Sequence, residues 1–283
     1  MGIGEQRMSI EEANDLRSMI IFGGTKGVGQ ILAEYYKENN FKVSIAGRHP
    51  ECEGIRDKTN VIKADISKEI DVESAFDLHL KCYGKNPDIV INCAALQGPI
   101  GNSWEVPAQE IEETLKTNLL GSFIVARAAI NRMIPAGLGS IIMFSGGGAV
   151  LARPNFNAYG SSKTGVLRMV ETVAEELKIA GHSGIIINAI APGAVKTGMM
   201  TEILNAGPKA GKKALDDAAG VIEKGGTPSQ EIINLINFLI DRKLNNGLTG
   251  RLIHVREDYS KLVKEYGKNV PDDIGKIRRI PIK

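Results

Sequence analysis

The chain of 283 residues has few cysteines, few aromatic residues and no long apolar run. Its three cysteines, Cys52, Cys82 and Cys93, include no Cys-x-x-Cys pair, which argues against both a disulfide framework and a zinc site. The four histidines are scattered without ligand spacing, so we expect no metal centre. This sparing use of cysteine fits the reducing cytoplasm.

An excess of charge of one sign is also missing. The 35 Lys and Arg residues nearly balance the 33 Asp and Glu residues, and no basic run is interleaved with aromatic residues. This pattern argues against a nucleic-acid surface and favours a small-molecule partner. No apolar stretch reaches the roughly 18 residues of a membrane span. The N-terminus lacks an apolar signal core, and Gln6 replaces the Ser or Thr of a myristoylation signal. We therefore expect a cytoplasmic protein that contacts neither nucleic acid nor membrane.

Apolar residues are abundant and occur in short runs. They make up 43% of the chain, enough for the core of one large domain. The apolar runs alternate with amphipathic stretches of helical length, which is the pattern of βαβ units. The expected strands are residues 19–22, 42–46, 60–63, 89–92, 140–145, 184–189 and 252–255. The expected helices are residues 27–39, 71–82, 108–134, 157–180 and 229–241.

This alternation predicts an α/β fold. We expect a doubly wound, Rossmann-type sheet of seven parallel strands with helices on both faces. The terminal segments fall outside the alternation and are rich in charge. The chain thus divides into an N-terminal extension (1–18), a Rossmann-type domain (19–255) and a charged C-terminal extension (256–283).

A glycine-rich turn joins the first expected strand to the first helix. Gly23, Gly27 and Gly29 have the spacing Gly-x-x-x-Gly-x-Gly. Glycines here allow the backbone to approach a pyrophosphate closely, while the helix N-terminus donates N–H groups to it. Such glycines can also serve tight packing alone, but the flanking strand and helix favour nucleotide binding. The other turn residues expected at this site are Thr25, Lys26 and Val28.

The end of the second strand indicates which dinucleotide binds. An NAD site usually carries an acidic residue there for the ribose hydroxyls, and this chain has Gly47. Arg48 and Lys26 lie at the two edges of the same expected adenosine site. Charge-assisted bonds to a phosphate contribute about 1.5–3 kcal/mol each. The alternative is two solvated surface cations. Their joint placement favours NADP(H) as the cofactor.

Tyr159 and Lys163 are four residues apart on the expected helix 157–180. This spacing places the phenol and the ammonium on one face, one turn apart. Together with the glycine turn, the pair resembles the short-chain dehydrogenase/reductase family, in its shorter single-domain branch, from about residue 19 to residue 255. Further segments that resemble the family in order are Asn92-Cys93-Ala94-Ala95, Asn118-Leu119-Leu120-Gly121 and Pro192-Gly193-Ala194-Val195-Lys196-Thr197.

The resemblance implies hydride transfer between a nicotinamide and a small carbonyl or alcohol substrate. Tyr159 would exchange the proton of the substrate oxygen, and the charge of Lys163 would favour the phenolate. Lys163 would also hold the nicotinamide ribose. Asn118 would position a water in a proton relay, the alternative being an Asn at a helix irregularity. By resemblance, the further cofactor contacts are Asp65, Asn92, Ala94, Pro192, Gly193, Val195 and Thr197.

The family's catalytic serine is displaced in this sequence. It normally stands thirteen residues before the tyrosine, where this chain has Gly146, and the serine is Ser145. Adjacent strand residues point to opposite faces, so a regular strand would turn Ser145 away from the substrate. The three glycines from Gly146 to Gly148 allow a bulge that would present either Ser145 or a backbone N–H to the substrate oxygen.

The substrate is expected at the carboxyl ends of the strands. Residues 199–204 repeat at helical spacing, which is typical of a core-facing helix and of a mobile lid alike. Trp104 is expected either in the pocket wall or in the core. The tail after residue 255 is expected to reach a neighbouring subunit or the pocket mouth. The expected pocket residues are Leu96, Gln97, Phe156, Met199 and Met200.

Other functions stay open beside a dehydrogenase or reductase of small carbonyl and alcohol substrates. A 3-oxoacyl-thioester reductase shares these motifs, and the missing serine suggests a non-catalytic NADP(H)-binding protein. The intact Tyr159, Lys163 and Asn118 argue against the latter. The apolar faces of residues 108–134 and 157–180 exceed what the sheet requires, so we expect a homotetramer or a homodimer.

Overall fold

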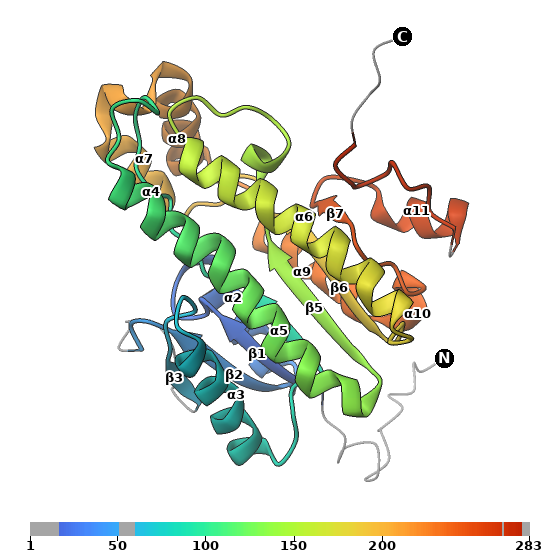
Figure 1. Cartoon of the computed structure of the whole chain (residues 1–283). Helices are drawn as coiled ribbons and strands as arrows, with labels where there is room; N and C mark the ends of the chain where they lie inside the picture. Colours follow the sequence, from blue (N-terminus) through green and yellow to red (C-terminus); the bar gives the residue numbers. More distant parts are fainter. Residues whose placement is uncertain (1–16, 51–59, 268, 279–283) are drawn as a thin grey trace, which may run out of the picture.

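The computed structural model describes residues 17–50, 60–267 and 269–278 (Figure 1). Its centre is one sheet of seven parallel strands in the order β3-β2-β1-β4-β5-β6-β7. The predicted doubly wound sheet is therefore confirmed, and each predicted strand end lies within about two residues of the observed one. The strands are β1 (Ser18–Phe22), β2 (Lys42–Gly47), β3 (Val61–Lys63), β4 (Ile89–Asn92), β5 (Gly139–Phe144), β6 (Ile185–Ala191) and β7 (Leu252–His254).

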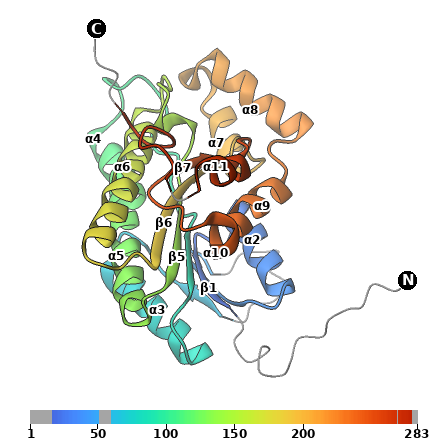
Figure 2. The same cartoon turned by 90° about the vertical axis from the view of Figure 1, so that its right-hand side faces the viewer.

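Helices cover both faces of the sheet, which Figure 2 shows on edge. Ile20 and Phe22 of β1 pack into one core with the first helical layer, and Met19 and Ile21 pack into the other. Because neighbouring strand residues point to opposite faces, both faces of β1 are apolar. The first layer contains α3 (Glu69–Tyr83), α4 (Ala108–Leu115), η1 (Lys116–Leu120), α5 (Gly121–Met133) and α6 (Asn157–Ile179). The second contains α2 (Gly27–Glu38) and α9 (Ser229–Ile240).

The strand order reverses at β1, which pairs with β2 on one side and β4 on the other. Phe22 lies opposite Ala46 of β2 and Asn92 of β4, so these strand ends meet. In open α/β sheets such a switch point leaves a crevice at the carboxyl ends of the strands, where ligands bind. The fold therefore sets the position of the site before any side chain is considered.

The helical stretch Ala108–Ala136 is long and apolar enough, by length and composition, to cross a membrane. The sequence predicted no such segment. In the fold, Val125, Ala128 and Ala129 of this stretch are buried against the sheet. A core helix passes the same composition test, and core packing accounts for the apolar residues on this face.

Smaller helices close the carboxyl end of the sheet. They are α7 (Gly198–Asn205), η4 (Gly207–Ala210) and α8 (Lys212–Lys224), which lie beyond the tip of β5 in Figure 1. Their apolar residues Ile203, Ala210 and Ala218 pack around Phe156 in a small core of their own. These helices form one wall of the site described below.

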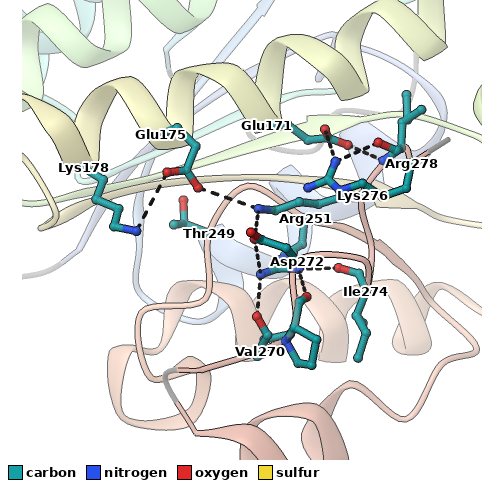
Figure 3. Close-up of polar contacts among 12 residues, drawn as sticks. Glu171, Glu175, Lys178, Thr249, Arg251, Val270, Asp272, Ile274, Lys276 and Arg278 are labelled. Atoms are coloured by element: carbon teal, nitrogen blue, oxygen red, sulfur yellow. Dashed lines mark hydrogen bonds and ion pairs between the residues drawn. The ribbon is translucent and has the colours of Figure 1, made fainter.

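The C-terminal extension folds back onto its own chain. After α10 (Arg242–Asn245), β7 and α11 (Tyr259–Tyr266), residues 269–278 return along β7 and α6 (Figure 3). Leu252 N donates to the Gly275 carbonyl at 2.7 Å, and the Arg251 guanidinium donates to the Val270 carbonyl at 2.9 Å. Residues 269–278 bind β7 and α6 and do not line the cavity at the carboxyl end of the sheet, so the predicted reach to the pocket mouth is not found for them. A contact of this segment with a neighbouring subunit stays a prediction. Most of the N-terminal extension lies outside the described residues.

Candidate active site

A cavity of about 820 Å³ opens at the carboxyl ends of the strands. Its volume lies within the usual range of ligand sites. It brings together the glycine turn, the ends of β2, β4 and β5, the start of α6, and α7 and α8. The predicted residues that line it are Gly23, Thr25, Lys26, Gly27, Val28, Gly29, Arg48, Asp65, Ala94, Ser145, Tyr159, Lys163, Pro192, Gly193, Val195, Thr197, Leu96, Gln97, Met199 and Met200.

The glycines of the turn are required by close backbone contacts. Gly23 has φ +75°, and a Cβ there would lie 2.5 Å from the Ala94 nitrogen of the β4 end. A Cβ on Gly29 would overlap the Gly23 carbonyl oxygen, which would push α2 away from the turn. Gly27 has φ +58° and faces Thr197 across the cavity. The same glycines therefore allow tight packing and leave room for a ligand. Packing and nucleotide binding are thus compatible explanations of the glycine spacing.

The space at Gly47 is filled by Thr25. A Cβ on Gly47 would lie 2.7 Å from Thr25 Oγ1, and Thr25 is buried. An acidic side chain at position 47 would displace Thr25. Both Arg48 and Lys26 are exposed and line the cavity.

Asp65 lies on the same side of the cavity as Arg48. Burial acts to raise the pKa of Asp65, but hydrogen bonds from Ser67 and the charge of Arg48 hold it below its usual value. Ser67 donates to Asp65 Oδ1 from its backbone nitrogen at 3.0 Å and from its hydroxyl at 2.8 Å. Asp65 is thus an anion beside Arg48.

Tyr159 and Lys163 lie one turn apart at the start of α6, as their spacing predicts. Lys163 Nζ donates to the Phe144 carbonyl at the end of β5 at 2.8 Å, and lies 5.8 Å from the centroid of the Tyr159 ring. Burial lowers the pKa of Lys163 to about 8. Burial raises the pKa of Tyr159, and the charge that acts against this increase is that of Arg153. The positive charge of Lys163 thus lies near the phenol, and its effect on the chemistry of Tyr159 stays a prediction.

Ser145 continues the strand without a bulge. Its nitrogen donates to the Ile190 carbonyl at 2.8 Å, and its hydroxyl donates to the Lys163 carbonyl at 3.3 Å. At the next position, a Cβ on Gly146 would lie 3.2 Å from Tyr159 Oη. Residue 146 therefore faces the phenol, as a regular strand predicts, while the Ser145 hydroxyl is directed to the backbone of α6.

Asn118 is completely buried in η1, a π-helical stretch between α4 and α5. Its side-chain amide donates to the Leu96 carbonyl at 2.9 Å and to Ser162 Oγ at 3.0 Å, and its Oδ1 accepts from Leu96 N at 2.7 Å. Asn118 thus links the loop after β4 to α6 through hydrogen bonds. It lies at a helix irregularity, which was the alternative to a role in a proton relay. Ser162, which sequence reasoning missed, completes this contact and donates its hydroxyl to the Tyr159 carbonyl at 2.7 Å.

Asn92 lies behind the cavity wall. It is buried, donates to Ser122 Oγ at 3.1 Å and accepts from Ala94 N at 3.1 Å. Its direct contact to a cofactor was expected from the resemblance. The structure places it one layer deeper, where it shapes the end of β4.

Two aromatic residues lie elsewhere than predicted. Phe156 is fully buried beneath the cavity, where it packs with α7 and α8. Trp104 is 82% exposed, and so belongs neither to a pocket wall nor to the core. Arg153, by contrast, was not singled out as a site residue and lines the cavity beside Tyr159.

Fold and site together define a Rossmann-type nucleotide-binding protein with a Tyr-Lys pair at the switch point. The family model of short chain dehydrogenases matches residues 17–207. The chain therefore belongs to the short-chain dehydrogenase/reductase family, whose members are oxidoreductases that use nicotinamide cofactors.

The chain is similar to characterised relatives across most of this region. It is 30% identical over 187 residues to a (21S)-21-acetoxyl-apo-melianone synthase of Melia azedarach, covering 64% of this chain and 68% of the relative. It is 29% identical over 192 residues to glucose 1-dehydrogenase 2 of Bacillus subtilis, covering 64% and 72%. The solved structure of an actinorhodin polyketide ketoreductase with NADPH superposes with a TM-score of 0.75 at 21% identity, covering 86% and 96%, which shows the shared fold.

Proposed function

We propose that the protein is an NADP(H)-dependent oxidoreductase that acts on a small carbonyl or alcohol substrate, with Tyr159 as the acid–base. One observation carries this proposal. Tyr159, half-buried at the start of α6, lines the same cavity as the glycine turn. A cofactor in that turn and a substrate oxygen at the phenol would therefore share one enclosed space.

The residues around the turn fit a dinucleotide. A Cβ on Gly27 would lie 3.4 Å from Thr197 Cγ2, so a larger residue would narrow the passage between the turn and the loop after β6. Lys163 uses one of its N–H donors on Phe144, which leaves others for ribose hydroxyls. When bound, the cofactor supplies or accepts the hydride, and the chain supplies the proton at Tyr159 Oη.

NADP(H) is proposed over NAD(H) on steric and electrostatic grounds. Thr25 occupies the space that an acidic residue at position 47 would need. Arg48 and Lys26 offer positive charge at the edges of the same part of the cavity. A guanidinium pairs well with a phosphate in a bidentate arrangement.

The test is a spectrophotometric screen of NADPH oxidation and NADP⁺ reduction across carbonyl and alcohol panels. On the substrate found, Tyr159→Phe keeps the ring and should lower kcat by about 100-fold or more with little change in NADPH affinity. Retention of full activity by this variant would contradict the proposed role of Tyr159.

Ser145→Ala should lower kcat by less than about tenfold, because the Ser145 hydroxyl donates to the backbone carbonyl of Lys163. A larger loss would assign Ser145 to the substrate oxygen.

A 3-oxoacyl-thioester reductase is the second candidate. A carrier-protein partner would favour a basic patch at the mouth of the cavity. Lys212 and Lys213 lie there, but they pair with Asp216 at 2.6 Å and with Asp217 at 2.8 Å. These ion pairs neutralise the positive charge of the two lysines. A free small molecule is therefore favoured as the substrate over one attached to a carrier protein.

We also propose that the enzyme is a cytoplasmic homotetramer or homodimer. Leu120 and Phe123 are each 48% exposed on the helical stretch that runs from α4 to α5. Cys82 and Cys93 are free thiols, which is compatible with a reducing compartment. Fractionation of the native host tests the location, and light scattering tests the oligomeric state.

A further inference from the structure

Arg153 lies between the outer part of the cavity and the catalytic tyrosine. Its Cζ is 3.8 Å from the centroid of the Phe156 ring and 5.9 Å from the centroid of the Tyr159 ring. Phe156 is fully buried, so the guanidinium lies over a fixed apolar platform. Stacking of this kind holds the planar group while its N–H donors stay available at its edge.

Among the residues that the structure describes, the guanidinium of Arg153 has no ion-pair partner. Within residues 17–50, 60–267 and 269–278, no hydrogen bond or ion pair engages its guanidinium. Burial lowers its pKa, and the neighbouring Tyr159 and the carboxylate of Asp217 act in the opposite direction. Asp217, however, is already paired with Lys213. A partly desolvated cation without a partner favours the binding of an anion from outside.

The remaining surroundings are mostly neutral or apolar. The lysines of α8 at the mouth are paired with Asp216 and Asp217, and Glu202 is exposed to solvent, where its charge is well screened. The apolar residues that line this part of the cavity are Leu151, Pro154, Met199, Met200, Ala214 and Val221. A ligand would therefore meet one cation next to the phenol and an apolar wall beyond it.

We propose that Arg153 binds a carboxylate of the substrate, so that the substrate is an oxo acid, or the matching hydroxy acid, with an apolar remainder. The proposal rests on the proposed function, because Tyr159 marks the position of the reacting carbonyl. Since Arg153 and Tyr159 are neighbours, only a few carbon atoms separate the carboxylate from that carbonyl. In the reduction, the carbonyl carbon accepts a hydride from NADPH and the carbonyl oxygen accepts a proton from Tyr159. The products are the hydroxy acid and NADP⁺, the carboxylate is unchanged, and the Tyr159 phenolate regains its proton from solvent.

Matched pairs of substrates test the proposal. NADPH oxidation is measured with 2-, 3- and 4-oxo acids that carry an alkyl chain, each beside its methyl ester. For at least one pair, the kcat/KM of the wild type should favour the acid by about tenfold or more. Arg153→Met removes the charge and keeps an unbranched side chain that can still pack on the Phe156 ring. It should abolish this preference, mainly through a higher KM for the acid. Because the charge of Arg153 also acts on the pKa of Tyr159, the result is read from the acid-to-ester ratio of kcat/KM, which should fall to about one.

Two further variants control for charge and for folding. Lys209→Met removes an equal charge from the neighbouring η4, outside the described lining of the cavity, and should leave the acid-to-ester ratio unchanged. Arg153→Lys keeps the charge without the planar fork and should lie between the wild type and Arg153→Met. It also replaces Arg153→Met if thermal denaturation shows that the latter is unfolded.

A binding measurement separates this inference from the proposed function. Hexanoate is titrated calorimetrically into the complexes of NADP⁺ with the wild type, Arg153→Met and Tyr159→Phe. Hexanoate should bind about tenfold more weakly to Arg153→Met and almost normally to Tyr159→Phe. Equal affinity of hexanoate for the wild type and Arg153→Met, or an unchanged acid-to-ester ratio, would overturn the carboxylate site. Full turnover by Tyr159→Phe would instead overturn the proposed role of Tyr159 as the acid–base. In that case the hexanoate titration alone would test whether Arg153 binds a carboxylate.

Discussion

Cofactor choice is decided by single residues at the end of β2. Because Thr25 fills the space beside Gly47, recognition of the adenosine ribose falls to the nearby cations. Arg48→Ala should weaken NADPH binding by about tenfold or more, or about 1.4 kcal/mol, and leave NADH binding nearly unchanged. Fluorescence titration of both cofactors measures the effect. Lys63→Ala, an exposed cation at the end of β3, is the control that should alter neither affinity. An equal loss for both cofactors would contradict the role of Arg48.

Buried Lys163 couples the site to the stability of the fold. Its pKa is lowered to about 8 by burial, whereas a lysine in the unfolded chain titrates near ~10.4. Between these values the unfolded chain binds more protons than the folded chain, so raising the pH stabilises the fold. The free energy of unfolding of the cofactor-free protein should gain on the order of 1 kcal/mol per pH unit from this group.

Urea unfolding of the wild type and of Lys163→Met, from pH 7 to pH 10, isolates this contribution. The variant lacks the group, so the gain above pH 8 should be absent from it. The same pH dependence in both proteins would show that Lys163 is not responsible.

At the scale of elements, α6 links the site to the C-terminal tail. Its first turns carry Tyr159 and Lys163, and its later turns carry Glu171, which is 4% exposed. Glu171 accepts from Ile277 N at 2.6 Å and from Arg168 at 2.6 Å. It also accepts from Arg278 of the tail at 3.3 Å (Figure 3). Because β7 is an edge strand, the tail also covers backbone groups that would otherwise invite another strand.

Glu171→Gln tests this link. The substitution keeps the shape of the side chain but removes the charge that holds Arg168 and Arg278, and should cost about 1–3 kcal/mol of unfolding free energy. Urea unfolding measures the loss, and hydrogen exchange should become faster in residues 270–278. Glu176→Gln changes an exposed acid on the same helix and serves as the control. Equal effects of the two substitutions would mean that the tail is held by other contacts.

At the scale of the whole molecule, the helical stretch from α4 to α5 offers an apolar face outside the core. Leu120 and Phe123 lie three residues apart and hence on one side of the helix. We expect light scattering at micromolar concentration to show a dimer or a tetramer. Phe123→Asp should shift the protein towards the monomer without unfolding it, whereas Ile70→Asp, at an exposed apolar residue of α3, should not. A monomeric wild type would refute the prediction.

The sequence by itself determined those features that depend on residues close together in the chain. Alternating apolar runs and amphipathic stretches predicted the sheet of seven strands, because the hydrophobic period follows from local backbone geometry. The spacing of Gly23, Gly27 and Gly29 and that of Tyr159 and Lys163 placed the turn and the pair for the same reason.

Tertiary structure decided whatever depends on contacts between distant segments. Trp104 is exposed, Phe156 lies beneath the cavity, and residues 269–278 bind β7 and α6. Residue 146, rather than Ser145, faces the phenol because the strand continues regularly into the glycine run. That no described residue forms an ion pair with Arg153 likewise became visible only when the charges of α8 were placed around it. Such contacts depend on how helices and strands pack against one another. Local periodicity shows which face of an element is apolar but not which distant residues that face meets.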